Sequence, residues 1–245
     1  MKKIMTFIIS STLLLTLSLG ITGCEEQASE EPAGEGAGGE EVVEEVITAV
    51  SDANERGYVE TEVTFENGNI ANVALTEYQD TGFAKGEDYD YEYFQEAMEI
   101  LPESFVEAND SDVDIVSGAT STSEKSIQAV ERAIALNEGE ELPFDGTFLG
   151  FSEVDDRDDR NMAWVTIEDG EMVDVELKEW YDVHEEEIKD EDYDYDPWHG
   201  AVEEMPERFL EADAVGDADA YTEATSSSEK WKEAVTNALN KAGVK

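Results

Sequence analysis

Val63-Thr64-Phe65-Glu66-Asn67-Gly68 and its near copy Val165-Thr166-Ile167-Glu168-Asp169-Gly170 decide the fold class of this chain. In each stretch, apolar residues alternate with polar ones up to a dipeptide that favours the positive φ angles of a type I′ turn. The alternation resumes after the turn, at Val73 and Leu75 in one case and at Val173, Val175 and Leu177 in the other. Each stretch therefore predicts an antiparallel hairpin with one buried face.

The two hairpins belong to a longer internal repeat. Glu87-Asp88-Tyr89-Asp90-Tyr91 returns as Glu191-Asp192-Tyr193-Asp194-Tyr195, and the segment 101–108 returns as 205–212 with the same spacing. Order and spacing shared over such a length indicate a duplicated unit rather than a biased composition. We therefore predict two copies of one domain, residues 42–137 and 143–245, joined near Asn137 to Pro143.

Each copy carries two helical patterns. An apolar stripe at helical spacing stops before Pro102 in the first copy and before Pro206 in the second, so we expect a helix that ends at each proline. A second amphipathic helix closes each copy. The apolar residues of these helices are Phe94, Ala97, Met98, Leu101, Ala129, Val130, Ala133 and Ile134, matched by Trp198, Ala201, Val202, Met205, Ala234, Val235, Ala238 and Leu239. The predicted class is α+β, an antiparallel sheet with helices packed against it.

The N-terminal segment predicts export. Two lysines precede an apolar run, as in a secretory signal, and the run ends in Ile21-Thr22-Gly23-Cys24, which resembles a bacterial lipobox. We expect residues 1–23 to be a lipoprotein signal peptide and Cys24 to carry the lipid. Residues 24–41, rich in Glu, Gly and Ala, predict a flexible acidic tether. Because Cys24 is the only cysteine, an intrachain disulfide is excluded.

The net charge of the chain limits the kinds of partner that it can bind. The 245 residues include 15 Lys and Arg against 63 Asp and Glu, a formal net charge of −48. Nucleic acid is excluded as a partner because binding it depends on basic residues that displace counterions. An anionic membrane surface would repel the protein unless a lipid anchors it. The acidic surface either concentrates metal cations or reflects adaptation to salt or alkali.

The start of the final helix in each copy predicts an anion site. Ser121 with Glu124, and Ser226 with Glu229, fit a capping box, which places Thr120 and Thr225 one residue before the N-cap. A helix N-terminus offers unpaired amides and the positive end of the helix dipole to an anion such as phosphate. Lys125 and Lys230 follow in the first turn and would add positive charge.

The residues just before the first of these helices resemble a known motif. Asp114-Ile115-Val116-Ser117-Gly118-Ala119-Thr120 resembles the flavinylation motif Asp-x-x-(Ser/Thr)-Gly-Ala-Thr of FMN-binding domains. Such domains occur in the sodium-pumping NADH:quinone oxidoreductase, in the Rnf complex and in extracellular flavin lipoproteins of Gram-positive bacteria. The resemblance implies FMN as cofactor, esterified through its phosphate to Thr120 by an ApbE-type flavin transferase. It also implies that the transferase requires Asp114 and that Ser117, Gly118 and Ala119 belong to the site.

The second copy departs from the motif at one position. Asp219-Ala220-Tyr221-Thr222-Glu223-Ala224-Thr225 keeps Asp219, Thr222, Ala224 and Thr225 but has Glu223 in place of the glycine. The resemblance implies a second FMN on Thr225. Glycine permits positive φ and close backbone approach, whereas glutamate adds bulk and charge beside a phosphate.

Other candidate sites are weaker. The acidic segments 155–159 and 217–219 lack the glycine and terminal glutamate of an EF-hand, so no metal site is assigned. One tyrosine of the Asp-Tyr-Asp-Tyr segments could contact the flavin ring, although packing on its own domain is the commoner use. His184 and His199 have no histidine counterparts in the first copy, which argues against a shared acid–base or metal role.

Together these features imply a lipid-anchored flavoprotein on the extracellular face of the cell membrane. By resemblance it would take electrons from a membrane NADH dehydrogenase or a quinol-linked donor and pass them to extracellular acceptors, as a carrier more than as an enzyme with its own substrate. Two alternatives remain open. One is a non-redox acidic lipoprotein that binds a cation or wall polymer, and the other is a surface flavin reductase.

Overall fold

The computed structural model describes residues 43–182 and 187–244, all within one compact unit, Glu41–Lys245. The predicted signal peptide, Cys24, the whole predicted tether and His184 lie outside the described residues. None of the helices in the described ranges is long and apolar enough to cross a bilayer.

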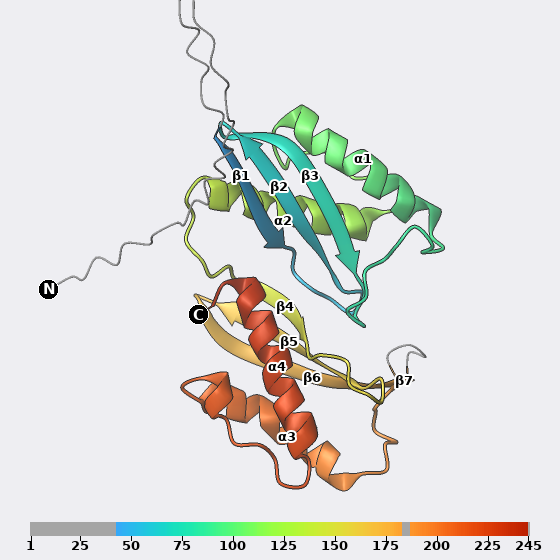
Figure 1. Ribbon diagram of the computed structural model, residues 1–245, viewed down its shortest axis with the longest axis vertical. Helices are drawn as coiled ribbons and strands as arrows, with labels where there is room; N and C mark the ends of the chain where they lie inside the picture. Colours follow the sequence, from blue (N-terminus) through green and yellow to red (C-terminus); the bar gives the residue numbers. More distant parts are fainter. Residues whose placement is uncertain (1–42, 183–186, 245) are drawn as a thin grey trace, which may run out of the picture. The chain divides into compact units, whose positions relative to one another are not determined.

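The first half of this unit begins with a three-stranded antiparallel sheet. Strands β1 (Glu44–Val50), β2 (Tyr58–Glu66) and β3 (Asn69–Tyr78) pair in chain order (Figure 1). Asn67 and Gly68 join β2 to β3 with φ angles of 51° and 80°. These positive values confirm the predicted two-residue turn.

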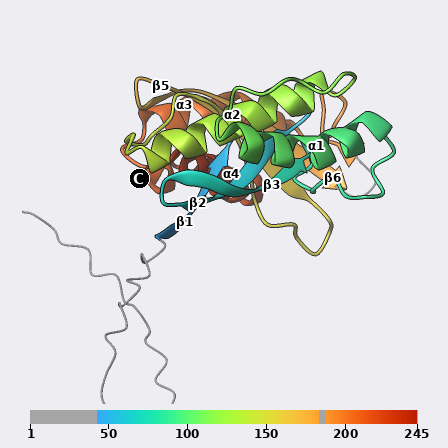
Figure 2. The same cartoon turned by 90° about the horizontal axis from the view of Figure 1, so that it is seen from above.

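Two helices cover one face of this sheet. Helices α1 (Glu92–Ala108) and α2 (Thr120–Asn137) pack on the strands, α1 against β3 and α2 against β1 and β2 (Figure 2). The core between them contains Val63 and Phe65 from the sheet, and Ala97, Leu101, Val130 and Ala133 from the predicted apolar stripes of the helices. This packing explains the alternating pattern of β2, whose other face carries polar residues.

One helix boundary differs from the sequence prediction in each half. Helix α1 continues through Pro102, and α3 (Asp196–Glu211) continues through Pro206. The residues after each proline extend the buried stripe, since Phe105 and Phe209 are both almost completely buried. Burial of a phenylalanine offsets much of the proline penalty, about 3 kcal/mol in a helix interior.

The second half repeats the order of elements. Strands β4 (Gly146–Phe151), β5 (Arg160–Glu168), β6 (Glu171–Asp182) and β7 (Glu187–Ile188) form an antiparallel sheet in chain order, followed by α3, a 3₁₀ turn (Val215–Asp217) and α4 (Thr225–Ala242). Asp169 and Gly170 again have positive φ angles. The predicted α+β class, with helices against antiparallel sheets, is confirmed.

Three cations, one buried and two partly buried, connect the two halves. Arg132 of α2 donates to the carbonyl oxygens of Val50 and Asp145, at 2.8 and 2.9 Å. Arg160 of β5 donates to the carbonyl oxygen of Thr81 at 2.8 Å. Lys241 of α4 donates to the hydroxyl of Tyr58 at 2.8 Å. In a chain with only 15 lysines and arginines, these contacts use a substantial share of its positive charge.

Candidate functional site

The motif helices begin earlier than the capping-box prediction required. Helix α2 starts at Thr120 and α4 at Thr225, after the N-cap residues Ala119 and Ala224, and neither start has a side-chain cap hydrogen bond. The prediction that Ser121 and Ser226 are N-caps is therefore wrong, because both lie inside the first helical turn. Each threonine instead occupies the first helical position.

A different serine holds each helix start. The Ser123 hydroxyl accepts a hydrogen bond from the Val116 amide at 3.0 Å and donates to the Ala119 carbonyl at 2.9 Å. In the second half, Ser228 accepts from the amide of Tyr221 and donates to the carbonyl of Ala224, at the same two distances. Sequence reasoning missed these serines. Their recurrence three residues after each motif threonine was the available signal.

The residue two before each threonine has left-handed backbone. Gly118 has a φ of 86°, and a Cβ placed there would come within 2.6 Å of the Tyr93 ring. Glu223, at the matching position, has a φ of 67°. The turn into the helix is therefore the same in both halves, and in the second it is made by a residue type that rarely adopts this conformation.

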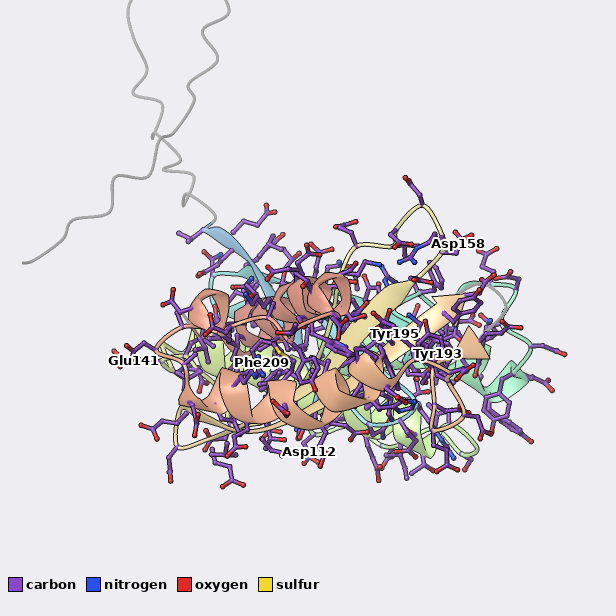
Figure 3. The ribbon with its side chains drawn as sticks, turned by 90° about the horizontal axis from the view of Figure 1, so that it is seen from below. Asp112, Glu141, Asp158, Tyr193, Tyr195 and Phe209 are labelled. Carbon is purple, nitrogen blue, oxygen red and sulfur yellow. The ribbon has the colours of Figure 1, made fainter. Side chains whose placement is uncertain are left out.

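One tyrosine from each Asp-Tyr-Asp-Tyr segment binds this turn. The Tyr91 hydroxyl donates to the Gly118 carbonyl at 2.6 Å, and the Tyr195 hydroxyl donates to the Glu223 carbonyl at 2.7 Å. Both tyrosines are exposed, and Tyr195 lies at the start of α3 beside Tyr193 (Figure 3). The tyrosine segments are thus part of the site in each half.

A buried carboxylate lies beneath each motif helix. Glu77 of β3, 2% exposed, accepts hydrogen bonds from Lys85 and from the Thr122 hydroxyl in the first turn of α2, both at 2.7 Å. The lysine compensates the buried charge, and the threonine connects it to the helix start. Thr122 is therefore buried and its hydroxyl already makes a hydrogen bond, whereas Thr120 is exposed.

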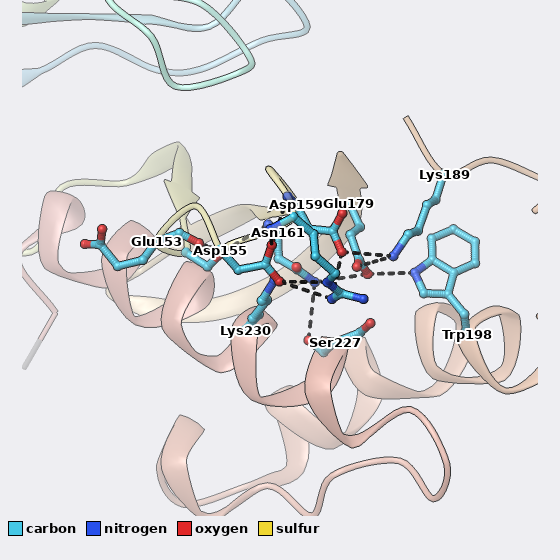
Figure 4. A network of polar contacts seen from close by, with 11 residues as sticks. Glu153, Asp155, Asp159, Asn161, Glu179, Lys189, Trp198, Ser227 and Lys230 are labelled. Carbon is cyan, nitrogen blue, oxygen red and sulfur yellow. Dashed lines mark hydrogen bonds and ion pairs between the residues drawn. The ribbon is translucent and has the colours of Figure 1, made fainter. Parts of the chain in front are cut away.

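In the second half, Glu179 of β6 has the corresponding place (Figure 4). It accepts hydrogen bonds from Lys189 and from the Trp198 indole, the latter at 2.8 Å. The Asn161 amide donates both to Glu179 and to the Ser227 carbonyl in the first turn of α4, each at 3.3 Å. Recurrence of a glutamate and a following lysine in both halves could have indicated this pair from the sequence.

The acidic segment 155–159 binds the chain's own cations. Asp155 accepts a hydrogen bond from Lys230 at 2.6 Å, and Arg157 pairs with Asp155 and with Asp159. Burial raises the pKa of the Asp155 carboxyl, but hydrogen bonds from Lys230 and Arg157 outweigh burial and hold the pKa well below its usual range. At Asp159 burial has the larger effect and raises the pKa. This segment is thus an internal ion-pair network.

The two first-turn lysines do not line the predicted anion sites. Lys125 is buried and donates to the Asn54 side chain and the Gly57 carbonyl, at 3.0 and 2.8 Å. Burial lowers the pKa of its ammonium group. Lys230 is held by Asp155. Both lysines anchor the loop between the first two strands of their half, so the prediction that they add charge to the anion sites is wrong.

Most of the predicted site residues are exposed to solvent, and two are buried. The residues available from solvent are Asp114, Ser117, Gly118, Thr120, Asp219, Thr222, Glu223 and Thr225, whereas Ala119 and Ala224 are buried N-caps. His199 packs on Trp198 and contacts the Tyr193 carbonyl through Nε2 at 2.6 Å.

Comparison with known proteins addresses the first half of the chain. The family model described as the FMN-binding domain matches residues 56–135. A crystal structure of the CPE2226 protein from Clostridium perfringens is similar at 24% identity and a TM-score of 0.36, covering 40% of this chain and 90% of that one. No curated protein matches the chain.

The residues around Thr120 fit a cofactor with a phosphate group. Thr120 places an exposed hydroxyl at the first position of an 18-residue helix, where the first amides have no partner within the helix. These amides and the helix dipole favour an anion next to the hydroxyl. At Gly118 the absence of a side chain lets the backbone approach the Tyr93 ring. Residues 56–135 belong to the FMN-binding domain family, and FMN is the cofactor of this protein.

Proposed function

We propose that this protein is an electron-transfer flavoprotein, anchored to the outer face of the cell membrane through a lipid on Cys24. In this proposal it is a tandem pair of FMN-binding domains, residues 42–137 and 143–245, with FMN esterified to Thr120 and to Thr225. It relays electrons from a membrane NADH dehydrogenase or a quinol-linked donor to extracellular acceptors.

The position of Thr120 is the observation that carries the proposal. Three features meet there within the matched segment: an exposed threonine, a helix start without a side-chain cap and a glycine turn. Thr122 also lies in this turn, but it is buried and its hydroxyl donates to Glu77. Thr120 is therefore the threonine that a transferase can reach.

The second site is supported by its geometry, since the family match ends at residue 135. Thr225 occupies the first position of an equally long helix, and Ser228 and Tyr195 make the same contacts there as Ser123 and Tyr91. Glu223 adopts the left-handed backbone that Gly118 adopts in the first half. The glutamate thus keeps the required turn, although its charge lies beside the expected phosphate.

Covalent attachment suits a carrier outside the cell. A cofactor that dissociates there is lost by dilution, and a chain of net charge −48 disfavours the return of an anionic nucleotide. FMN supplies the electron chemistry, and the chain positions it and sets its electrostatic surroundings.

Peptide mass spectrometry of exported full-length protein, co-expressed with an ApbE-type transferase, tests this proposal. We expect an added mass of FMN less one water on the peptides that contain Thr120 and Thr225. Thr120→Val should remove the first adduct, while Thr122→Val should keep it. The cell fraction should also contain the lipid-modified Cys24 peptide.

Each result has a distinct meaning. An adduct on Thr120 alone would reduce the proposal to one flavin and identify Glu223 as the reason to examine. The absence of any adduct, with a transferase shown to be active on a control protein, would overturn the proposal that the protein carries covalently bound FMN. Replacement of Cys24 by Ala without release of the protein from membranes would overturn the lipid anchor.

A further inference from the structure

An arginine of α3 binds the motif loop of the second half. The Arg208 guanidinium donates a hydrogen bond to the carbonyl oxygen of Asp219, the first residue of the second motif, at 2.9 Å. The first half has Ser104 at the position of Arg208. The Ser104 hydroxyl donates to the Ile100 carbonyl at 2.9 Å, within its own helix. The arginine contact with the motif loop is therefore a feature of the second half.

Two neighbouring residues accommodate this arginine. Tyr221 stands where the first motif has Val116, and the guanidinium carbon of Arg208 lies 5.3 Å from the centre of the Tyr221 ring. Tyr221 packs over Gly200 of α3, where a Cβ would come within 2.3 Å of the tyrosine hydroxyl oxygen. The first half has Glu96 at the position of Gly200. The arginine, the tyrosine and the glycine thus form one arrangement, and each of them differs from its counterpart.

Glu204 binds the guanidinium from within the helix. It precedes Arg208 by one helical turn and accepts a hydrogen bond from the arginine at 2.8 Å. The guanidinium is therefore bonded by a carboxylate and by the loop, and one aromatic ring lies against it. Such a planar group is already oriented, so it loses little further freedom when it holds the loop.

The same loop contains a residue with strained backbone. Glu223 has a φ of 67°, in the left-handed region that disfavours L side chains. The first half has Gly118 at this position, and glycine adopts such angles without a steric cost. The second loop therefore needs stabilising contacts from other parts of the chain more than the first loop does.

We infer that Arg208 is a positioning residue that compensates for Glu223, by holding the second motif loop in the conformation that Gly118 allows in the first. Its hydrogen bond to Asp219 and its contact with Tyr221 restrain the residues that lead into Glu223. A strained residue persists where the surrounding structure fixes it in this way.

The loop leads directly into the helix that begins with Thr225. Its conformation therefore decides how the threonine is presented to a flavin transferase, and this consequence rests on the proposed function. Compensation predicts that the effects of substitutions at Arg208 and Glu223 depend on each other. Residues that act on one loop give effects that are not additive.

Unfolding of the full-length protein, expressed without the transferase, tests the compensation. The proteins compared are the unchanged chain, Arg208→Ser, Glu223→Gly and the double variant, which has the first-half residues at both positions. In the unchanged chain, Arg208→Ser should raise the equilibrium constant of unfolding roughly tenfold, because a hydrogen bond from a charged group is lost. In the Glu223→Gly chain the rise should be less than about threefold, because glycine keeps the turn without the arginine.

Attachment of FMN tests the same dependence at Thr225. The initial rates of adduct formation are measured by peptide mass spectrometry with the transferase, and Thr120 of the same molecule is the internal standard. Arg208→Ser should lower the Thr225 rate roughly tenfold relative to the Thr120 rate, because fewer molecules have the loop in the competent conformation. In the Glu223→Gly chain the same substitution should change this ratio less than about threefold. A Thr120 rate like that of the unchanged chain shows that the variant is folded.

Arg56→Ser is the matched control. It removes the same charge and introduces the same residue at an exposed position, in the loop between β1 and β2. It should leave the ratio of the two rates unchanged. A comparable fall in the Thr225 rate with Arg56→Ser would mean that net charge causes the effect, and would overturn the inference.

Additive effects would also overturn the inference, since Arg208→Ser would then cost the same stability with glutamate and with glycine at position 223. So would an unchanged ratio of the two rates in the Arg208→Ser protein. If the unchanged chain carried FMN on Thr120 and none on Thr225, the second flavin of the proposed function would be wrong. The unfolding comparison would then decide by itself whether Arg208 compensates for Glu223.

Discussion

Gly118 is the residue of the motif with the least freedom to change. Its φ of 86° disfavours any L side chain, and the space where a Cβ would lie is taken by the Tyr93 ring. Gly139 has a similar φ of 93°, but a Cβ there meets nothing within 4 Å. The two glycines thus separate the conformational cost of a side chain from its steric cost.

Gly118→Ala should destabilise the protein more than Gly139→Ala does. We expect Gly139→Ala to lower the free energy of unfolding by about 1 kcal/mol through backbone strain alone. The Gly118 variant should lose that amount and more, because Tyr93 must move. Urea denaturation of both variants measures the difference. Equal losses would mean that the contact with the Tyr93 ring has no cost.

Glu223 shows the limit of motif matching at the residue scale. Its departure from glycine predicts an altered turn, yet the backbone keeps the left-handed conformation with a φ of 67°. The Tyr195 hydroxyl bonds its carbonyl and supports the turn. Hydrogen bonds from elsewhere in the chain can hold a strained residue in place, and a local motif does not contain them.

The helix start is the element on which sequence and structure differ most. The pattern Ser-x-x-Glu predicted a capping box at Ser121, but α2 begins at Thr120 and has no side-chain cap hydrogen bond. Ser123 stabilises the loop instead, by bonding the Val116 amide. A serine-rich stretch offers several candidates for one role, and only the path of the preceding loop selects among them.

Ser123→Ala should destabilise α2 and its loop, whereas Ser121→Ala should not. Removing the Ser123 hydroxyl leaves the Val116 amide without its partner in the protein interior, at a cost of about 1 to 3 kcal/mol. Ser121→Ala should change the free energy of unfolding by less than about 0.5 kcal/mol. Chemical denaturation of both variants provides the comparison. If Ser121→Ala lost more free energy of unfolding than Ser123→Ala, the capping-box prediction would be supported instead.

The prolines of α1 and α3 also show a difference between the sequence prediction and the structure, because both helices continue through them. Sequence rules end a helix before Pro102, but the buried stripe resumes at Phe105 in the next turn. Each helix continues because a phenylalanine after the proline, Phe105 or Phe209, is buried in the hydrophobic core. The energy of that packing depends on a partner that the local pattern does not show.

Across the whole molecule, the contact between the halves contains a partly buried lysine. Lys241 donates to the Tyr58 hydroxyl and to the Leu149 carbonyl, and burial lowers the pKa of its ammonium group to about 7. Glu60 opposes this effect, and Arg160 adds to it. Burial also raises the pKa of Tyr58 above its ordinary value. The folded protein therefore releases the Lys241 proton at a lower pH than the unfolded chain does.

The stability due to Lys241 should increase with pH. Above pH 7 the unfolded chain keeps this proton while the folded protein loses it, so the free energy of unfolding rises. Relative to Lys241→Met, the native protein should gain up to about 2 kcal/mol between pH 7 and about pH 9. Above that range Tyr58 ionises in the unfolded chain and acts in the opposite direction. Urea denaturation of both proteins at each pH measures the difference between their free energies of unfolding. A difference that stays constant or falls as the pH rises would contradict this prediction.

The sequence alone was sufficient for the hairpins, the α+β class, the buried helix faces and the motif that identified the FMN-binding family. These features depend on alternation, helical spacing and turn residues, all of which act between near neighbours. The tertiary structure decided that Ser123 holds the helix start, that Lys125 anchors a distant loop and that Glu77 lies beneath Thr122. These contacts depend on the path of the folded chain, and the longest of them join segments that are far apart in the sequence. The energy of such a contact cannot be read from the residues on either side of it.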